Sequence, residues 1–200
     1  MKTAQMAAFD FSEIPILETA RLRLRRIMRA DCDDWLSALQ SPGAIDWLSD
    51  FESAPRREEV QGIIDWAEAI FAERTGIRWA LTLKPDDRLV GTCGFHLYSQ
   101  TRHCAEIGYE LHSSYWRRGL MSEAAAAVMR FCFDRLWLHR LAADATEGNV
   151  ASAALLQKLG FSLEGVLRER VFWRGGHHNL WLFSLLEPDY HELVAAGRLA

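Results

Sequence analysis

The turn at residues 116–122 has the residue types and the spacing of an anion-binding site. It follows an alternating segment at residues 104–111 and leads into an alanine-rich segment that predicts a helix. The first backbone N–H groups of a helix have no partner within the helix, and the helix dipole places partial positive charge there. Arg117 and Arg118 add charge, and Gly119 lets the backbone approach a ligand closely. The turn therefore predicts a phosphate site built largely from main-chain N–H groups.

A carboxylate on the preceding segment is a candidate general base. Apolar residues at 105, 107, 109 and 111 point to one face of the predicted strand, while Glu106, Gly108 and Glu110 point to the other. A buried carboxylate is costly unless it is paired or used in chemistry. Glu106 could remove a proton from an ammonium, directly or through a water. The alternative is that Glu106 or Glu110 forms an ion pair with a neighbouring arginine.

A second polar pair stands at the start of a later helix. Asn149 occupies the expected N-cap position, and Ser152 lies in the first turn. Capping alone explains the presence of Asn149, so these residues by themselves indicate only where a helix begins.

The elements that position these residues follow from hydrophobic periodicity. The predicted strands cover residues 21–27, 77–84, 88–97, 104–111, 140–146, 161–168 and 178–186. The predicted helices cover residues 31–39, 56–74, 120–136 and 149–159. A meander of strands followed by strand–helix–strand units predicts an α/β (α+β) fold. We expect a mixed central sheet of about seven strands with helices on both faces.

Composition restricts the class of protein. A chain of 200 residues fits one domain, here predicted at residues 19–187 between an N-terminal extension (1–18) and a C-terminal tail (188–200). The net charge of −4 argues against a general nucleic-acid binder. The sequence has neither an apolar run of membrane-spanning length nor the apolar core of a signal peptide, so we expect a cytoplasmic protein without a membrane partner.

No metal site is expected from the histidines and cysteines. The four cysteines, at positions 32, 93, 104 and 132, form no C-x-x-C pair. Three histidines, at positions 96, 103 and 112, surround the proposed site, but without the spacing of metal ligands.

Five motifs, in this order, resemble those of the GNAT superfamily of acetyl-CoA-dependent N-acetyltransferases, and most of all its RimJ/RimL type, which acetylates protein N-termini. The motifs are ETARLRLRRI (18–27), LVGTCGF (89–95), AEIGYEL (105–111), YWRRGLMSEA (115–124) and GNVASAALLQKLGFSLEG (148–165). The acyl-CoA pattern of the family, Q/R-x-x-G-x-G/A, is kept at Gly119 only. Trp116 and Met121 stand at its first and last places, where the RimJ/RimL subgroup often has an aromatic residue and a methionine.

The resemblance implies a splayed sheet that holds acetyl-CoA. The pantetheine arm would lie along the strand that ends at Leu111, and the turn at 117–122 would bind the pyrophosphate. The resemblance further implies that Glu106 is the base and that Ser152 is an acid toward the leaving thiolate. The residues that it assigns to the cofactor are Tyr109, Leu111, Arg117, Arg118, Gly119, Leu120, Met121, Ser122, Asn149 and Ser152.

The implied function is transfer of an acetyl group to a primary amine, with a protein N-terminal α-amine as one acceptor. The alternatives are a small amine, such as a polyamine, an amino acid analogue or an antibiotic, or a CoA-binding regulatory module without catalysis. The expected partners are acetyl-CoA and the amine, and the protein would act as a monomer or homodimer.

Overall fold

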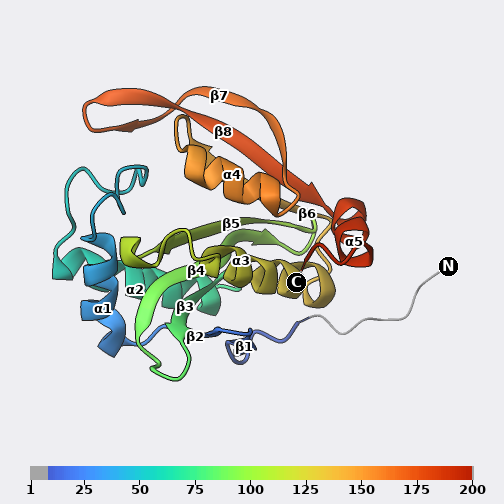
Figure 1. Cartoon of the computed structure of the whole chain (residues 1–200), viewed down its shortest axis with the longest axis horizontal. Helices are drawn as coiled ribbons and strands as arrows, with labels where there is room; N and C mark the ends of the chain where they lie inside the picture. The colour runs from blue at the N-terminus through green and yellow to red at the C-terminus, as the bar shows by residue number, and fades with distance from the viewer. Residues whose placement is uncertain (1–8, 200) are drawn as a thin grey trace.

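One eight-stranded sheet organises the computed structural model of the protein, which describes residues 9–199 (Figure 1). The strands lie in the order β1-β2-β3-β4-β5-β6-β8-β7. All neighbouring strands are antiparallel except β5 and β6, which are parallel. The strands are β1 (Leu17–Glu18), β2 (Leu22–Arg26), β3 (Ile77–Leu83), β4 (Leu89–Ser99), β5 (Cys104–Leu111), β6 (Arg140–Thr146), β7 (Ser162–Trp173) and β8 (Gly176–Leu186).

Helices cover both faces of the sheet, as the sequence predicts. They are α1 (Cys32–Leu39), α2 (Arg57–Ala72), α3 (Leu120–Arg130), α4 (Val150–Lys158) and α5 (Glu187–Ala195). Helix α3 continues into a single π-helical turn, Phe131–Arg135. Helices α1 and α2 share one hydrophobic cluster, around Trp35, Val60 and Ile64. Helices α3, α4 and α5 share the other and larger cluster, which lies on the opposite face.

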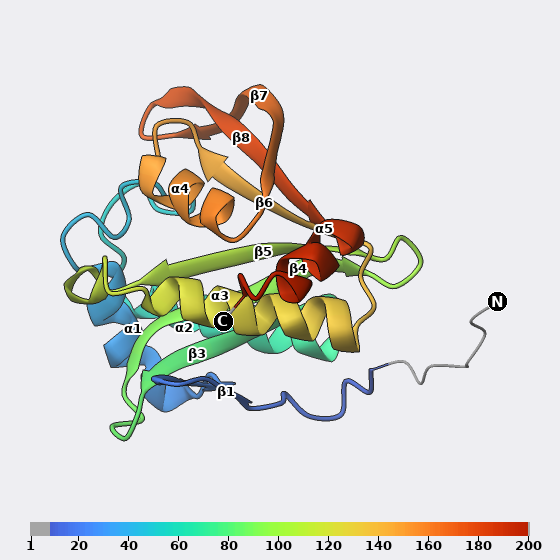
Figure 2. The same cartoon turned by 45° about the vertical axis from the view of Figure 1, so that its right-hand side comes forward.

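The sheet opens between its two parallel strands. Only residues 104–106 of β5 pair with residues 140–142 of β6. Beyond Glu106, β5 keeps its pairing with β4 as far as Leu111, while β6 continues along β8. Figure 2 shows β6 rising away from β5, so that β6, β7, β8 and α4 form an upper part of the molecule. The predicted mixed, partly splayed sheet is therefore confirmed.

Two elements have no counterpart in the sequence prediction. Strand β1 is only two residues long and raises the number of strands from about seven to eight. Helix α5 begins at Glu187, in the segment for which the pattern indicates no helix. Its Tyr190 packs against Phe133 with the ring centroids 4.5 Å apart, and its hydroxyl donates to Asp134 at 2.9 Å. No helix within residues 9–199 is long and apolar enough to cross a membrane.

An ion pair between Arg140 of β6 and Glu164 of β7 predicts a pH-dependent contribution to stability. Glu164 accepts from Arg140 Nη1 and from the Ser184 hydroxyl, each at 2.7 Å. Mainly because of Arg140, the pKa of Glu164 falls from 4.5 to about 2. Because the folded-state pKa is lowered, this contribution is complete above pH 4.5 and is lost as the pH falls toward 2.

We expect Arg140→Gln to lower the free energy of unfolding at pH 7 by about 1 kcal/mol or less, since both side chains are partly exposed. The difference from the unsubstituted protein should shrink at pH 3. Urea unfolding at the two pH values measures it, and an equal difference at both would contradict the assigned role of the ion pair.

Candidate active site

A cavity of about 800 Å³ lies where the parallel strands separate. Its walls come from α1, α2, the 47–51 loop, strands β3 to β6 and β8, and the N-terminal end of α4. The cavity brings together Glu106, Tyr109, Asn149 and Ser152, four of the site residues that the sequence analysis names. These residues come from β5 and from the start of α4, so they lie close together only in the folded protein.

Glu106 faces this cavity from β5 and keeps about a quarter of its side chain exposed. Its neighbour across the β4–β5 pair is His96, whose Nε2 lies 3.4 Å from Glu106 Oε1. No arginine or lysine within residues 9–199 forms an ion pair with this carboxylate. Glu106 is therefore buried enough to be shielded yet open to a ligand in the cavity, which suits a group that exchanges protons with that ligand.

Glu110, on the same face of β5, is held in a different way. Arg78 forms an ion pair with it, Thr92 donates a hydrogen bond, and Trp35 Nε1 donates at 2.9 Å. Only about a tenth of each side chain in the Arg78–Glu110 pair is exposed. The alternative of ion pairing with an arginine thus applies to Glu110, whose carboxylate is occupied by protein donors.

Two hydroxyl groups meet across the opening of the sheet. The Tyr109 phenol lies 2.8 Å from Ser152 Oγ, although the two residues belong to β5 and α4. Burial is the main cause that raises the pKa of Tyr109, so its phenol stays protonated at neutral pH. Asn149 accepts from the Ser152 N–H at 3.1 Å, so Asn149 is the helix cap that its position predicts.

The predicted anion-binding turn stands at the N-terminus of α3. Gly119 is the N-cap residue and adopts φ +75°, a left-handed conformation that favours glycine. The side chains of Leu120 and Met121 are buried in the core. Any ligand here would therefore meet the main chain of these two residues and the partly exposed Ser122.

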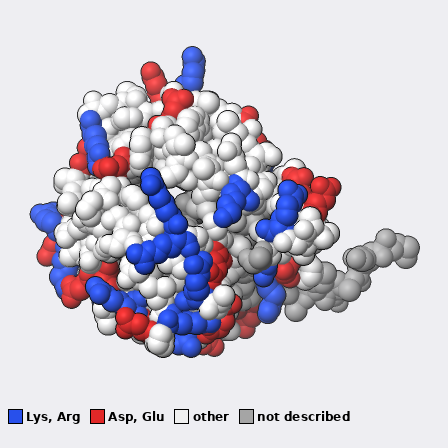
Figure 3. All heavy atoms as spheres, in the orientation of Figure 1, with Lys and Arg blue, Asp and Glu red and all other residues white. Residues whose placement is uncertain are grey.

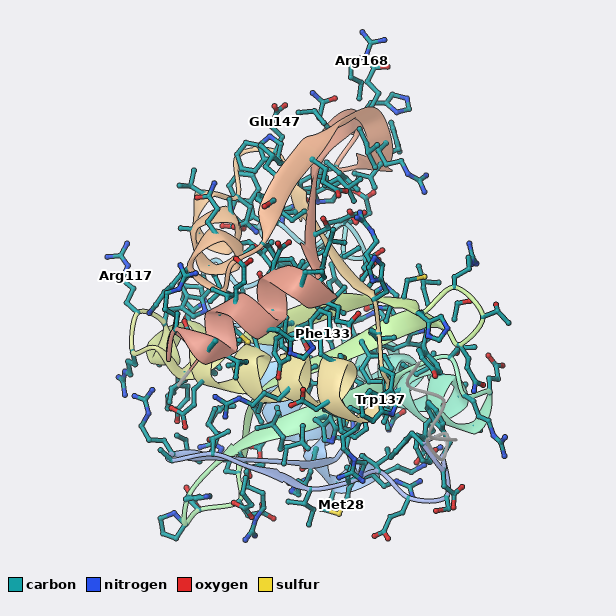
Figure 4. The ribbon with its side chains drawn as sticks, turned by 90° about the vertical axis from the view of Figure 1, so that its right-hand side faces the viewer. Met28, Arg117, Phe133, Trp137, Glu147 and Arg168 are labelled. Carbon is teal, nitrogen blue, oxygen red and sulfur yellow. The ribbon has the colours of Figure 1, made fainter. Side chains whose placement is uncertain are left out.

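Basic side chains surround this turn. Arg117 and Arg118 are exposed, and Figure 4 shows Arg117 pointing away from the ribbon. Arg21 Nη1 donates to the Arg118 carbonyl at 2.8 Å, while its Nε contacts Glu123. Lys and Arg side chains gather across the middle of the face shown in Figure 3. The turn lies outside the lining of the main cavity, so the structure gives two separate zones, one suited to an anion and one to an acceptor.

Several side chains of the cavity were not identified as site residues from the sequence. Asp144 of β6 and Arg78 of β3 line it, but each acquires its place through strand register, which the sequence does not display. The tryptophans at positions 35, 47 and 66 also line it. Trp35 is buried, whereas Trp47 and Trp66 are 41% and 40% exposed.

Comparisons with known proteins agree with this geometry. The sequence model of the acetyltransferase (GNAT) domain matches residues 21–162. The uncharacterised N-acetyltransferase YoaA of Bacillus subtilis is 36% identical, over 87% of this chain and 98% of its own length. The ribosomal protein uS5-alanine N-acetyltransferase of Escherichia coli is 29% identical over 53% of this chain and 56% of its own. RimL, a ribosomal α-N-protein acetyltransferase solved with coenzyme A, superposes with a TM-score of 0.78 at 19% identity, covering 88% and 99% of the two chains.

The chain therefore belongs to the GNAT family of acetyltransferases. It is an N-acetyltransferase with acetyl-CoA as co-substrate. Within residues 9–199, no group of three or more His, Cys, Asp and Glu side chains is arranged to hold a metal ion.

Proposed function

We propose that the protein acetylates a primary amine bound in the cavity beside Glu106. The observation that carries this proposal is the position of Glu106, which faces a cavity at the open seam with no arginine or lysine of residues 9–199 paired to it. An amine attacks a thioester only when it is unprotonated, so a base is needed at this place.

The reaction would proceed by direct transfer. Glu106 accepts a proton from the substrate ammonium, directly or through a water, and the freed nitrogen attacks the thioester carbonyl carbon. Backbone N–H groups of the unpaired side of β5 stabilise the oxyanion of the tetrahedral intermediate. The carbon–sulfur bond then breaks, the amide forms, and the thiolate takes a proton as CoA leaves.

The cofactor would lie along the opening between β5 and β6. In this placement Tyr109 and Leu111 border the pantetheine arm and Asn149 contacts it. The pyrophosphate would rest on the turn of Arg117, Arg118 and Gly119 and on the first N–H groups of α3. The support for this placement is that β5 has no β6 partner beyond Glu106 and runs on to Leu111, shortly before the turn.

The acceptor that we favour is the α-amine of a protein or peptide N-terminus. The similarity to a uS5-alanine N-acetyltransferase and to RimL supports this choice. A small amine is the second candidate, because the cavity of about 800 Å³ also has room for a small molecule.

An amine panel tests the proposal. Thioester cleavage would be followed with acetyl-CoA, short peptides with different N-terminal residues, polyamines and aminoglycosides. Faster turnover with any peptide than with a free polyamine would support the N-terminal acceptor, and the reverse order would replace it with a small amine. Acetyl-CoA binding without turnover on any amine would identify a regulatory module instead.

Ser152→Ala should lower the rate constant of acetyl transfer while acetyl-CoA still binds. Its hydroxyl, in contact with Tyr109, is the group placed to protonate the departing thiolate. Because a CoA thiolate leaves readily, we expect a loss of no more than about 10²-fold, the lower end for general acid catalysis. Single-turnover kinetics measure this step.

The helix should tolerate the Ser152→Ala change, because Asn149 caps α4 through the backbone N–H of residue 152. Tyr109→Phe is the companion variant, since it removes the other hydroxyl of the contact. An unchanged single-turnover rate in both variants would leave protonation of the thiolate to water.

A further inference from the structure

We propose that Asp144 is a second carboxylate that binds the acceptor's ammonium, and that it selects primary amines without a neighbouring carboxylate. The acceptor class is thus a peptide N-terminus or a diamine, whereas a free amino acid is disfavoured. This inference rests on the proposed function, since it assumes that the amine enters the cavity beside Glu106.

Strand register places Asp144 on the same face as Glu106. Ala142 of β6 is the register partner of Glu106 in the parallel β5–β6 pair. Register partners in a sheet point to the same face, and so do residues two positions apart on one strand. Asp144 therefore lies two residues beyond Ala142, the last β6 residue paired with β5, and on the same face, and both carboxylates line the cavity.

Two polar atoms in this cavity lack the partners that burial requires. Asp144 Oδ1 and His96 Nδ1 are inaccessible to solvent and form no hydrogen bond with any other group in residues 9–199. An unsatisfied buried polar atom costs free energy, and at Asp144 it shows that the protein itself supplies no donor to Oδ1. An ammonium has three N–H donors, so it can donate to Asp144 and Glu106 together.

The charge distribution around Asp144 favours a cation. The pKa of Asp144 is raised, first by burial and next by the negative charge of Glu106, while Arg170 and His96 act in the opposite direction. A cation between the two carboxylates would relieve their mutual repulsion. Glu110 in the same cavity differs from Asp144, because Arg78 already compensates the negative charge of Glu110.

The charges of the whole cavity lining explain why an amine without a neighbouring carboxylate would be preferred. Five acidic residues and one arginine line the cavity, and that arginine, Arg78, is bound to Glu110. The exposed indoles of Trp47 and Trp66 add aromatic surface on which a cation is stabilised. A carboxylate next to the acceptor amine would meet like charge, and the arginine of the described lining is already bound to Glu110.

Steady-state kinetics with alaninamide and alanine test this inference, because an uncharged amide replaces the carboxylate in alaninamide. The comparison is made at equal concentrations of the unprotonated amine, since the amide also lowers the pKa of the amine. The unsubstituted protein should prefer alaninamide. Asp144→Asn should raise the KM for alaninamide by about 10- to 100-fold, the effect of losing a hydrogen bond to a charged group. The KM for acetyl-CoA should stay unchanged, kcat should fall less than KM rises, and Asp144→Glu should recover part of the affinity.

Asp189→Asn is the matched control, because it makes the same change on the exposed surface of α5. An Asp144→Asn protein with an unchanged KM for alaninamide, or with an equal rise in the KM for acetyl-CoA, would overturn the role of Asp144. Equal use of alanine and alaninamide by the unsubstituted protein would overturn the proposed selection against a carboxylate next to the amine. Absence of turnover with every amine would instead overturn the proposed function.

Discussion

Glu106→Gln should lower turnover by about 10²-fold or more at neutral pH while acetyl-CoA affinity stays the same, because a positioned base contributes on this scale. Glutamine keeps the shape of the side chain but cannot accept the proton of an ammonium. The substitution leaves no buried cation of residues 9–199 uncompensated, since the ionisable side chain in contact with Glu106 is His96, at 3.4 Å. The stability of the fold should therefore change little.

Glu110→Gln is the matched contrast on the same face of the same strand. It would leave Arg78 without its carboxylate in a largely buried position, so it should lower the melting temperature. Stopped assays at several pH values distinguish the loss of a base in Glu106→Gln from the loss of stability in Glu110→Gln. The activity lost in Glu106→Gln should return in part with an amine that is already neutral at the assay pH. Near-normal activity with a fully protonated amine would assign the base to another residue or to a water chain.

Gly119→Asp should abolish most of the thermal stabilisation that acetyl-CoA gives. A ligand at one hundred times its Kd stabilises a protein by about 2.7 kcal/mol, and a carboxylate beside the pyrophosphate would remove much of this through repulsion. Gly119 is the N-cap of α3, so its substituent stands among the N–H groups that would hold the anion.

Gly119→Asn separates charge from backbone strain. Gly119 adopts φ +75°, which asparagine tolerates better than most residues, and a Cβ at this position would have Arg21 Nη2 as its nearest neighbour, at 3.5 Å. Differential scanning fluorimetry with and without acetyl-CoA should show a shift for Gly119→Asn and almost none for Gly119→Asp. A full shift in Gly119→Asp would show that the pyrophosphate lies elsewhere.

The elements predicted correctly are those with strong local patterns. The alternation in β5 places Glu106 and Glu110 on the face opposite Ala105 and Ile107, as the sequence indicates, because a strand has a period of two residues. The turn before α3 is found because Gly119 marks a left-handed position at a helix start. Strand β1 and helix α5 are missed because their stability comes from tertiary contacts, to β2 and to Phe133 respectively.

The same reason limits what the sequence says about the site. Glu106 could be chosen because it is one of two carboxylates on a largely apolar strand. That Glu106 and Glu110 have different roles depends on Arg78, which is 32 residues from Glu110 in the chain. Ser152 could be placed in a helix cap, yet its contact with Tyr109 joins residues 43 positions apart. The role of Asp144 depends on the register between β5 and β6, and no local pattern specifies that register.

The β5–β6 pairing is short, so few backbone hydrogen bonds join the two halves of the sheet. Three register pairs join its two halves, and the stacked rings of Phe133 and Tyr190 link the end of the α3 segment to α5. Neither aromatic residue lines the cavity. A ligand in the seam would occupy backbone groups of β5 that otherwise lack a strand partner on the β6 side. Slower amide exchange along residues 107–111 would report a ligand bound in the seam.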